Sequence, residues 1–187
     1  MAFAIAFVAL LAMKTLVFNI CTIEGNAFEP TLMAGDRVLI NRWSYGLRIG
    51  TSDGFFGYGR LGRRPVSRGD LVAFENPRQR SQLLICCCTG LPGDTIHPTL
   101  QNSRTPTLLH SQNLTLVIPS LANCSDADYY WMEAIGDSLA TDSRQLGFIP
   151  EECIVGRAFA ILYSHDPVAS ILSGWRTQRA LTSTSHP

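Results

Sequence analysis

Six cysteines are the side chains in this sequence with the clearest capacity to act as nucleophiles or metal ligands. A cysteine nucleophile needs a base close by, and of the four histidines only His97 lies near the triplet Cys86, Cys87 and Cys88, beyond a turn. There is no CxxC pair, so neither a zinc site nor thioredoxin-like redox chemistry is indicated. We therefore predict no metal site and no cofactor.

The cysteine spacing favours buried thiols that pack as small hydrophobic side chains. On an extended strand, Cys86 and Cys88 would point to one face and Cys87 to the other. A disulfide is the alternative if the domain is extracytoplasmic. It would join Cys124 to Cys153, or one of them to the triplet.

The composition sets limits on the class of protein that carries these residues. The chain has 187 residues, of which 46% are hydrophobic and only 16% charged, and its formal net charge is zero. The length fits one domain with an anchor, and the apolar balance favours a membrane-attached protein. A net charge of zero gives no basis for binding nucleic acid.

The N-terminal segment predicts a transmembrane helix. Ala2–Met13 carries no charge, and the apolar character resumes after Lys14 as far as Ile23. About 20 apolar residues cross the hydrocarbon core, so we predict a single-pass anchor over residues 1–23. A buried soluble helix is one alternative. A cleaved signal peptide is another, although its basic start is missing. Charge does not fix the orientation, because three arginines follow the span: Arg37, Arg42 and Arg48.

The remaining chain predicts a mainly β body, because short alternating segments are separated by turns rich in Gly, Pro and Asp. Val38 and Ile40 should share one face of a strand, and Pro77 should end another. The expected divisions are a β domain over 24–164, a Gly/Arg-rich irregular insertion at 46–67, a variable polar excursion at 97–128 and a C-terminal tail at 165–187.

Four motifs in a fixed order make the pattern specific. They are Phe28-Glu29-Pro30-Thr31-Leu32 with Gly35-Asp36-Arg37-Val38-Leu39, then Arg68-Gly69-Asp70-Leu71-Val72-Ala73-Phe74, then Gly90-Leu91-Pro92-Gly93-Asp94, and last Asp142-Ser143-Arg144 with Ile154-Val155-Gly156-Arg157-Ala158. Their order and spacing resemble those of type I signal peptidases. The resemblance implies a membrane anchor followed by an antiparallel β-sheet body with a small, reduced second β region.

The resemblance also implies a serine nucleophile and a lysine general base, and this chain departs from that pattern. The nucleophile position falls on Ala27, thirteen residues after Lys14. The other functional positions fall on Gly25 for the oxyanion hole, Cys86 for the general base and Ala140 for the serine that orients the lysine. The motif positions that match and would frame the site are Phe28, Pro30, Gly90, Pro92, Gly93, Asp94, Asp142 and Arg144.

These departures predict a pseudo-peptidase, because alanine has no nucleophilic atom and loss of a serine nucleophile costs about 10⁶ in rate. The expected location is the cytoplasmic membrane, with the β domain on the extracytoplasmic side. The expected partners are membrane lipid, signal peptides or exported protein subunits, and an active signal peptidase. The expected role is assembly or chaperoning. The alternative is an active endopeptidase that uses a non-standard set of residues.

Overall fold

The computed structural model describes residues 3, 5–7, 17–22, 32–33, 35–50, 57–97, 115–123, 126–134, 141–165 and 175–176. Within them the chain forms twelve strands: β1 Phe18–Thr22, β2 Asp36–Asn41, β3 Leu47–Ile49, β4 Gly59–Leu61, β5 Leu71–Asn76, β6 Gln79–Gly90, β7 Thr95–Ile96, β8 Leu116–Val117, β9 Tyr129–Glu133, β10 Ile149–Pro150, β11 Ile154–His165 and β12 Trp175–Arg176. Three short helical turns join them: η1 Leu121–Asn123, α2 Ser143–Leu146 and η2 Glu151–Cys153.

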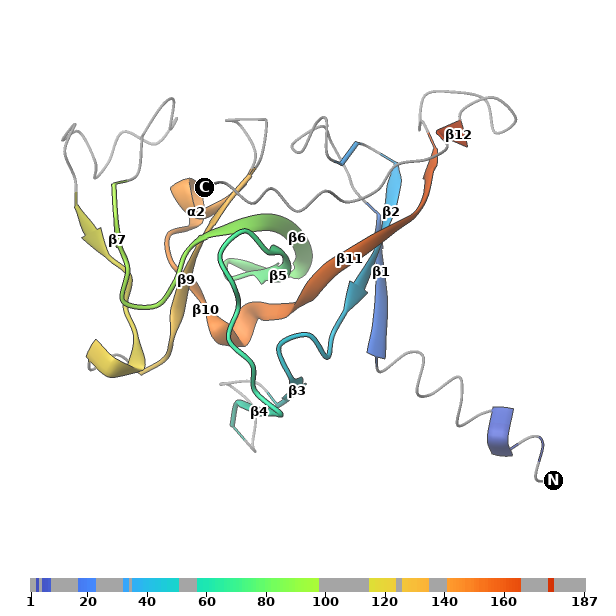
Figure 1. The fold of residues 1–187 in the computed structure, drawn as a ribbon, viewed down its shortest axis with the longest axis horizontal. Helices are drawn as coiled ribbons and strands as arrows, with labels where there is room; N and C mark the ends of the chain where they lie inside the picture. Colours follow the sequence, from blue (N-terminus) through green and yellow to red (C-terminus); the bar gives the residue numbers. More distant parts are fainter. Residues whose placement is uncertain are drawn as a thin grey trace.

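The predicted mainly β, antiparallel architecture is confirmed. In the described residues, eight strands form one sheet in the order β1-β2-β11-β5-β6-β9-β10, with β12 paired to β11 (Figure 1). Strands β7 and β8 form a separate two-stranded sheet, as do β3 and β4. The long strands β6 and β11 lie in the interior of this sheet, because each pairs with a neighbouring strand on both of its sides.

The core follows the expected alternation of side chains. Val38 and Ile40 of β2 are both completely buried, whereas Leu39 between them is only partly buried and Arg37 before them is exposed. Strand β5 is buried on both faces, with Phe74 at its centre, which is typical of a strand covered on each side. The cysteines of the triplet are buried beside it, so the prediction of core thiols is confirmed. Cys153 is also a free thiol, so the alternative of a disulfide at this residue is wrong.

The N-terminal prediction needs one correction. The anchor was expected to end at Ile23, but Phe18–Thr22 forms strand β1, which pairs along its whole length with β2. Phenylalanine, isoleucine and threonine favour strands, and the pairing satisfies backbone groups at the edge of the sheet. No helix in the described parts of the chain is long and apolar enough to cross a membrane. Residues 1, 2, 4, 8–16 and 23 of the predicted span lie outside those parts.

The Gly/Arg-rich insertion is more ordered than its composition suggested. Leu47–Ile49 pairs with Gly59–Leu61 as a hairpin, and its arginines reach into the body. Residues 51–56 between the two strands lie outside the described residues. The C-terminal tail likewise contributes strand β12, whose Trp175 pairs in register with His165 of β11.

Candidate functional site

Strand β6 carries the position expected to hold the general base. Cys86 has 0% of its surface exposed and lies opposite Val72 of β5 in the antiparallel register. Its sulfur is 4.0 Å from the carbonyl oxygen of Thr141. Burial raises the pKa of this thiol far above its ordinary value, and the nearby Asp142 carboxylate raises the pKa further. The thiol is therefore protonated at neutral pH.

The Asp142–Arg144 pair lies next to this thiol. The Arg144 guanidinium donates through Nε to Asp142 Oδ2 at 2.8 Å, and its second nitrogen lies 2.6 Å from the same oxygen. Asp142 also caps helix α2 by accepting the backbone N–H of Arg144 at 2.9 Å. A fourth donor is the backbone N–H of Ala134 at 3.0 Å. The hydrogen bond to Asp142 raises the pKa of Arg144, so the guanidinium stays charged.

This pair is largely shielded from solvent. An exposed ion pair contributes about 0–1 kcal/mol, but Asp142 has 0% of its surface exposed and four hydrogen-bond or ionic contacts. Ser143 reinforces the loop, because its hydroxyl accepts the backbone N–H of Met132 at 2.9 Å. Asp142, Ser143 and Arg144 therefore form a hydrogen-bonded loop next to Cys86.

The turn from Gly90 to Asp94 closes the same end of β6. Asp94 Oδ2 accepts the backbone N–H of Leu91 at 2.6 Å, and the Asp94 N–H donates to the carbonyl of Leu91 at 3.0 Å. Gly93 has a positive φ of 86°, which suits glycine. A side chain at Gly90 would approach Ile118 to 2.5 Å, so strand β6 packs directly on the segment after β8. These positions determine the fold around the site.

Comparison with known proteins identifies the family of this chain. The family model for "Signal peptidase, peptidase S26" matches residues 1–163.

The chain belongs to the signal peptidase family.

Among its relatives is signal peptidase I of Pseudomonas fluorescens, which is 26% identical over 87% of this chain and 70% of its own length. Signal peptidase I of Rickettsia prowazekii is also 26% identical, over 87% of this chain and 78% of its own length. A probable signal peptidase I-2 of Synechocystis is 26% identical over 82% of this chain and 67% of its own length. The similarity therefore extends over the β body as well as the N-terminal region.

Only some of the predicted site residues can be placed. The structure brings Cys86, Asp142 and Arg144 together, and it places Gly90, Pro92, Gly93 and Asp94 in the turn that follows β6. Five predicted positions lie outside the described residues: Gly25, Ala27, Phe28, Pro30 and Ala140. The assignment of the four substituted catalytic positions therefore stays a prediction.

One further fact of the sequence bears on the general base. Lys14 is the only lysine in the chain, and it lies in the apolar N-terminal segment. Strand β6, which carries the expected position of the general base, contains no lysine. The pKa of Cys88 is raised to about 12 by burial, so it is no better a base at neutral pH than Cys86.

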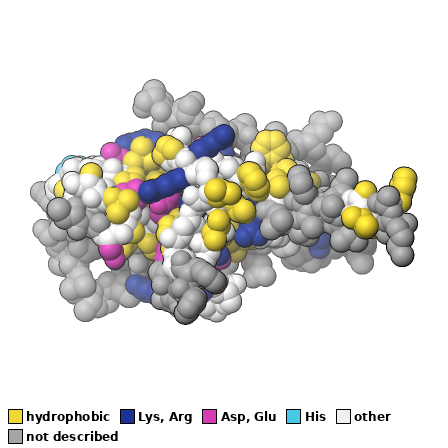
Figure 2. Space-filling view, turned by 90° about the horizontal axis from the view of Figure 1, so that it is seen from below, with side chains coloured by type: hydrophobic (Ala, Val, Ile, Leu, Met, Phe, Trp, Pro, Cys, Tyr) yellow, Lys and Arg dark blue, Asp and Glu magenta, His cyan; other side chains and the backbone are white. Residues whose placement is uncertain are grey.

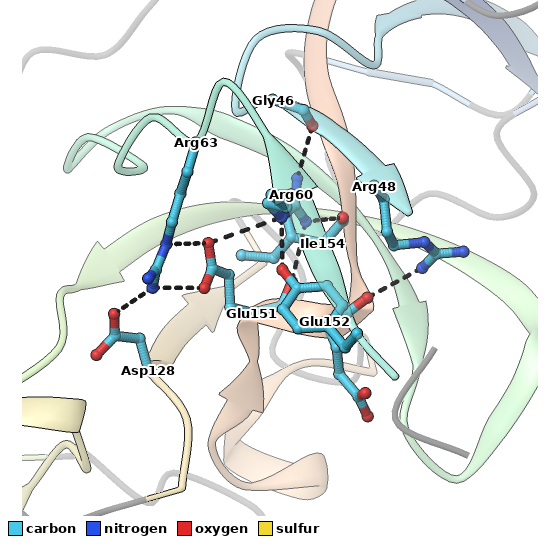
Figure 3. A network of polar contacts seen from close by, with 9 residues as sticks. Gly46, Arg48, Arg60, Arg63, Asp128, Glu151, Glu152 and Ile154 are labelled. Carbon is cyan, nitrogen blue, oxygen red and sulfur yellow. Dashed lines mark hydrogen bonds and ion pairs between the residues drawn. The ribbon is translucent and has the colours of Figure 1, made fainter. Parts of the chain in front are cut away.

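The structure contains a second polar cluster that the sequence did not indicate (Figure 3). We call it the arginine clamp, and its members are Arg48, Arg60, Arg63, Asp128 and Glu151. Arg60 of β4 donates to the carbonyl oxygens of Gly46 at 3.2 Å and Glu151 at 3.0 Å, and also to that of Ile154. Arg63 forms a 2.9 Å hydrogen bond from Nε to Glu151 and a 2.6 Å ion pair with Asp128. The clamp fixes the β3–β4 hairpin to the turn η2. The only sequence signal was the number of arginines in the insertion.

Proposed function

We propose that this chain is a non-catalytic member of the signal peptidase family that binds extended segments of signal peptides or exported subunits. It would act as an assembly factor or chaperone, or as a partner of an active peptidase. One observation carries the proposal: Cys86, which the resemblance assigns to the position of the general base, is a buried thiol next to the Thr141 carbonyl and the Asp142–Arg144 pair.

The chemistry of this position supports inactivity. A general base must be able to accept a proton near neutral pH, and a nucleophilic cysteine must be a thiolate. Cys86 meets neither requirement, because burial raises the pKa of its thiol and Asp142 opposes the thiolate charge. The alanine at position 27 removes the nucleophile that the family pattern would provide.

Peptide binding is supported by the edge of the main sheet. Within the described residues, β1 pairs with a strand on one side only. Its side chains are largely exposed, and Ile20 has 56% of its surface accessible. An extended peptide can add to such an edge through main-chain hydrogen bonds. Gly25 and Ala27 follow this strand directly in the sequence, so a bound peptide would run toward the degenerate site.

The proposed location is the cytoplasmic membrane, with one span and with the β domain on the extracytoplasmic side. The uncharged run Ala2–Met13 supports a span that ends before β1 begins at Phe18. A flotation assay with full-length protein in vesicles tests the span. Protease protection of the β domain then tests the orientation.

The decisive experiment measures cleavage and binding separately. Full-length protein in a neutral detergent is mixed with a fluorescent signal-peptide substrate, and cleavage is followed by mass spectrometry. We expect no cleavage above buffer and saturable binding by fluorescence anisotropy. Ile20→Lys should weaken binding about fivefold, since a charged edge residue opposes strand addition. Phe159→Lys is the control, because Phe159 is 65% exposed on β11, which has neighbours on both sides.

Two outcomes would contradict the proposal. Clear cleavage that disappears in Cys86→Ala would establish the alternative, an active peptidase with a non-standard set of residues. Binding that Ile20→Lys and Phe159→Lys weaken equally would mean that the peptide does not use the edge of β1.

A further inference from the structure

An open pocket lies between the turn after β2 and the end of the β3–β4 hairpin. It has a volume of about 340 Å³, and we call it the Trp43 pocket; its lining residues are Asn41, Trp43, Ser44, Gly46, Leu61, Gly62 and Arg64. None of these residues belongs to the predicted peptidase site. The volume lies at the lower end of the range for small-molecule sites, which is about 300–1,000 Å³.

Hydrogen bonds to the backbone and close backbone contacts define the shape of this pocket. The Asn41 side chain accepts the backbone N–H of Trp43 at 3.0 Å, and Gly46 donates to the Trp43 carbonyl at 3.2 Å. Gly46 has a φ of 93°, and a side chain there would approach the carbonyl oxygens of Leu61 and Gly62 to 2.8 Å. The two walls are therefore in close contact at the base, which the arginine clamp also holds.

The rim of the pocket combines exposed apolar side chains with cationic ones. Trp43 has 50% of its surface exposed and Leu61 has 62%, so two large apolar side chains are exposed at the same pocket. Arg64 is exposed on the rim, and Arg42 precedes Trp43 in the turn. Among the described residues, neither guanidinium forms an ion pair. A tryptophan and a leucine beside two arginines that have no ion pair in the described part of the chain match an anionic amphiphile.

The position of the pocket points to one such amphiphile, a membrane lipid. The backbone N–H of Arg42 donates to the carbonyl of Val17 at 2.9 Å, so the turn is bonded to the residue at which the apolar N-terminal segment enters β1. Figure 1 shows that β1 starts at the same end of the sheet as the β3–β4 hairpin. Figure 2 shows the molecule from below, with hydrophobic and Lys/Arg side chains side by side on this face.

We propose that the Trp43 pocket binds the headgroup of an anionic phospholipid, with Arg64 and Arg42 facing the phosphate and with Trp43 and Leu61 in the interfacial region. Tryptophan favours this depth of a bilayer, and cationic side chains are attracted to anionic lipids. The contact would hold the β body against the bilayer beside its anchor. The inference uses the proposed anchor for its location and does not depend on whether peptides are cleaved.

The first experiment measures headgroup binding without a bilayer. Full-length protein in neutral detergent is titrated with dihexanoyl-phosphatidylglycerol, with dihexanoyl-phosphatidylcholine and with inorganic phosphate, and Trp emission is recorded. We expect saturable binding of dihexanoyl-phosphatidylglycerol only. Arg64→Gln should weaken it about fivefold. Arg68→Gln is the control, because Arg68 is 60% exposed but already pairs with Asp94 at 2.7 Å.

The second experiment places Trp43 in a membrane. The protein is reconstituted in phosphatidylglycerol vesicles that contain lipid brominated near the top of the acyl chain, which quenches nearby tryptophan. We expect Trp43→Phe to remove most of the quenched emission. Trp131→Phe should leave the quenching in place, because Trp131 has only 5% of its surface exposed.

Three results would overturn the inference. Equal binding of dihexanoyl-phosphatidylglycerol and dihexanoyl-phosphatidylcholine would exclude recognition of the anionic headgroup. Binding of inorganic phosphate as tight as that of the lipid would assign the pocket to a free anion. Quenching unchanged by Trp43→Phe would place the pocket away from the bilayer. If the protein fails to float with vesicles, the proposed anchor is wrong, and the detergent titration still decides the pocket.

Discussion

The sulfur of Cys86 lies 4.0 Å from the carbonyl oxygen of Thr141, the residue that precedes the buried Asp142. The contact joins strand β6 to the loop that carries the Asp142–Arg144 ion pair. A lysine ammonium at position 86 would therefore meet a carbonyl, a carboxylate and the Arg144 guanidinium in a buried place. Desolvation and the guanidinium would lower the pKa of the lysine, whereas Asp142 would raise it. The groups that would set the pKa of a lysine at position 86 are thus next to this position.

Restoring two side chains tests this directly. Ala27→Ser with Cys86→Lys should give measurable cleavage of a signal-peptide substrate by the full-length protein, and adding Gly25→Ser and Ala140→Ser should increase the rate about 10²–10³-fold through the oxyanion hole and the positioned lysine. Mass spectrometry of the products gives the rate. Cys86→Lys alone is the control and should remain inactive. Activity equal in the control and in the double variant would exclude Ala27 as the nucleophile position.

The buried thiols predict alkaline sensitivity. Burial raises the pKa of Cys153 to about 11, mainly through desolvation, with Glu152 adding to the rise. Because the folded pKa lies above the unfolded value of about 8.5, this thiol stabilises the fold fully below pH 8.5, and the contribution is lost as pH rises through 11. Urea unfolding of wild-type protein in reductant should show stability falling between pH 9 and 11. Cys153→Ala should flatten that fall by up to about 1.4 kcal/mol per pH unit. Parallel curves would contradict the prediction.

The sequence was sufficient for the fold class because the strands are marked by local signals. Alternation predicted the buried face of β2, and Pro77 predicted the end of β5 at Asn76. The end of the predicted anchor was wrong because apolar residues such as Phe18 and Ile20 suit a lipid-facing helix and an exposed edge strand equally.

The arginine clamp could not be predicted for a different reason. Arg60 is 94 residues from Ile154, and only the closed fold brings its guanidinium to that carbonyl. Composition alone makes such an arginine look like a solvated charge. The Trp43 pocket was hidden for the same reason, because its two walls come from separate segments, around Asn41 and Leu61.

Asp142 should be more important for stability than an ordinary surface acid. Asp142→Asn leaves the Arg144 guanidinium without an anion and places an amide donor among N–H donors. We expect a loss of about 2–3 kcal/mol in the free energy of unfolding, measured by urea unfolding at pH 7. Asp126→Asn at an exposed position is the control and should change stability by less than about 0.5 kcal/mol. A similar small change for both variants would show that the pair contributes no more than a surface salt bridge.

The arginine clamp should decide whether the β3–β4 hairpin stays attached to the body. The Arg60 side chain is 1% exposed and lies 3.7 Å from the Glu151 carboxylate, so Arg60→Met would leave several buried carbonyl oxygens without a donor. Removing one partner of a buried pair costs about 3–5 kcal/mol, although Arg63 still pairs with Glu151. We therefore expect a loss of about 3 kcal/mol, with faster hydrogen exchange at Leu47–Ile49. Arg68→Met, which breaks an exposed pair, should cost about 0–1 kcal/mol and leave that exchange unchanged. Equal exchange rates in the two variants would show that the hairpin is held by its own pairing and not by the clamp.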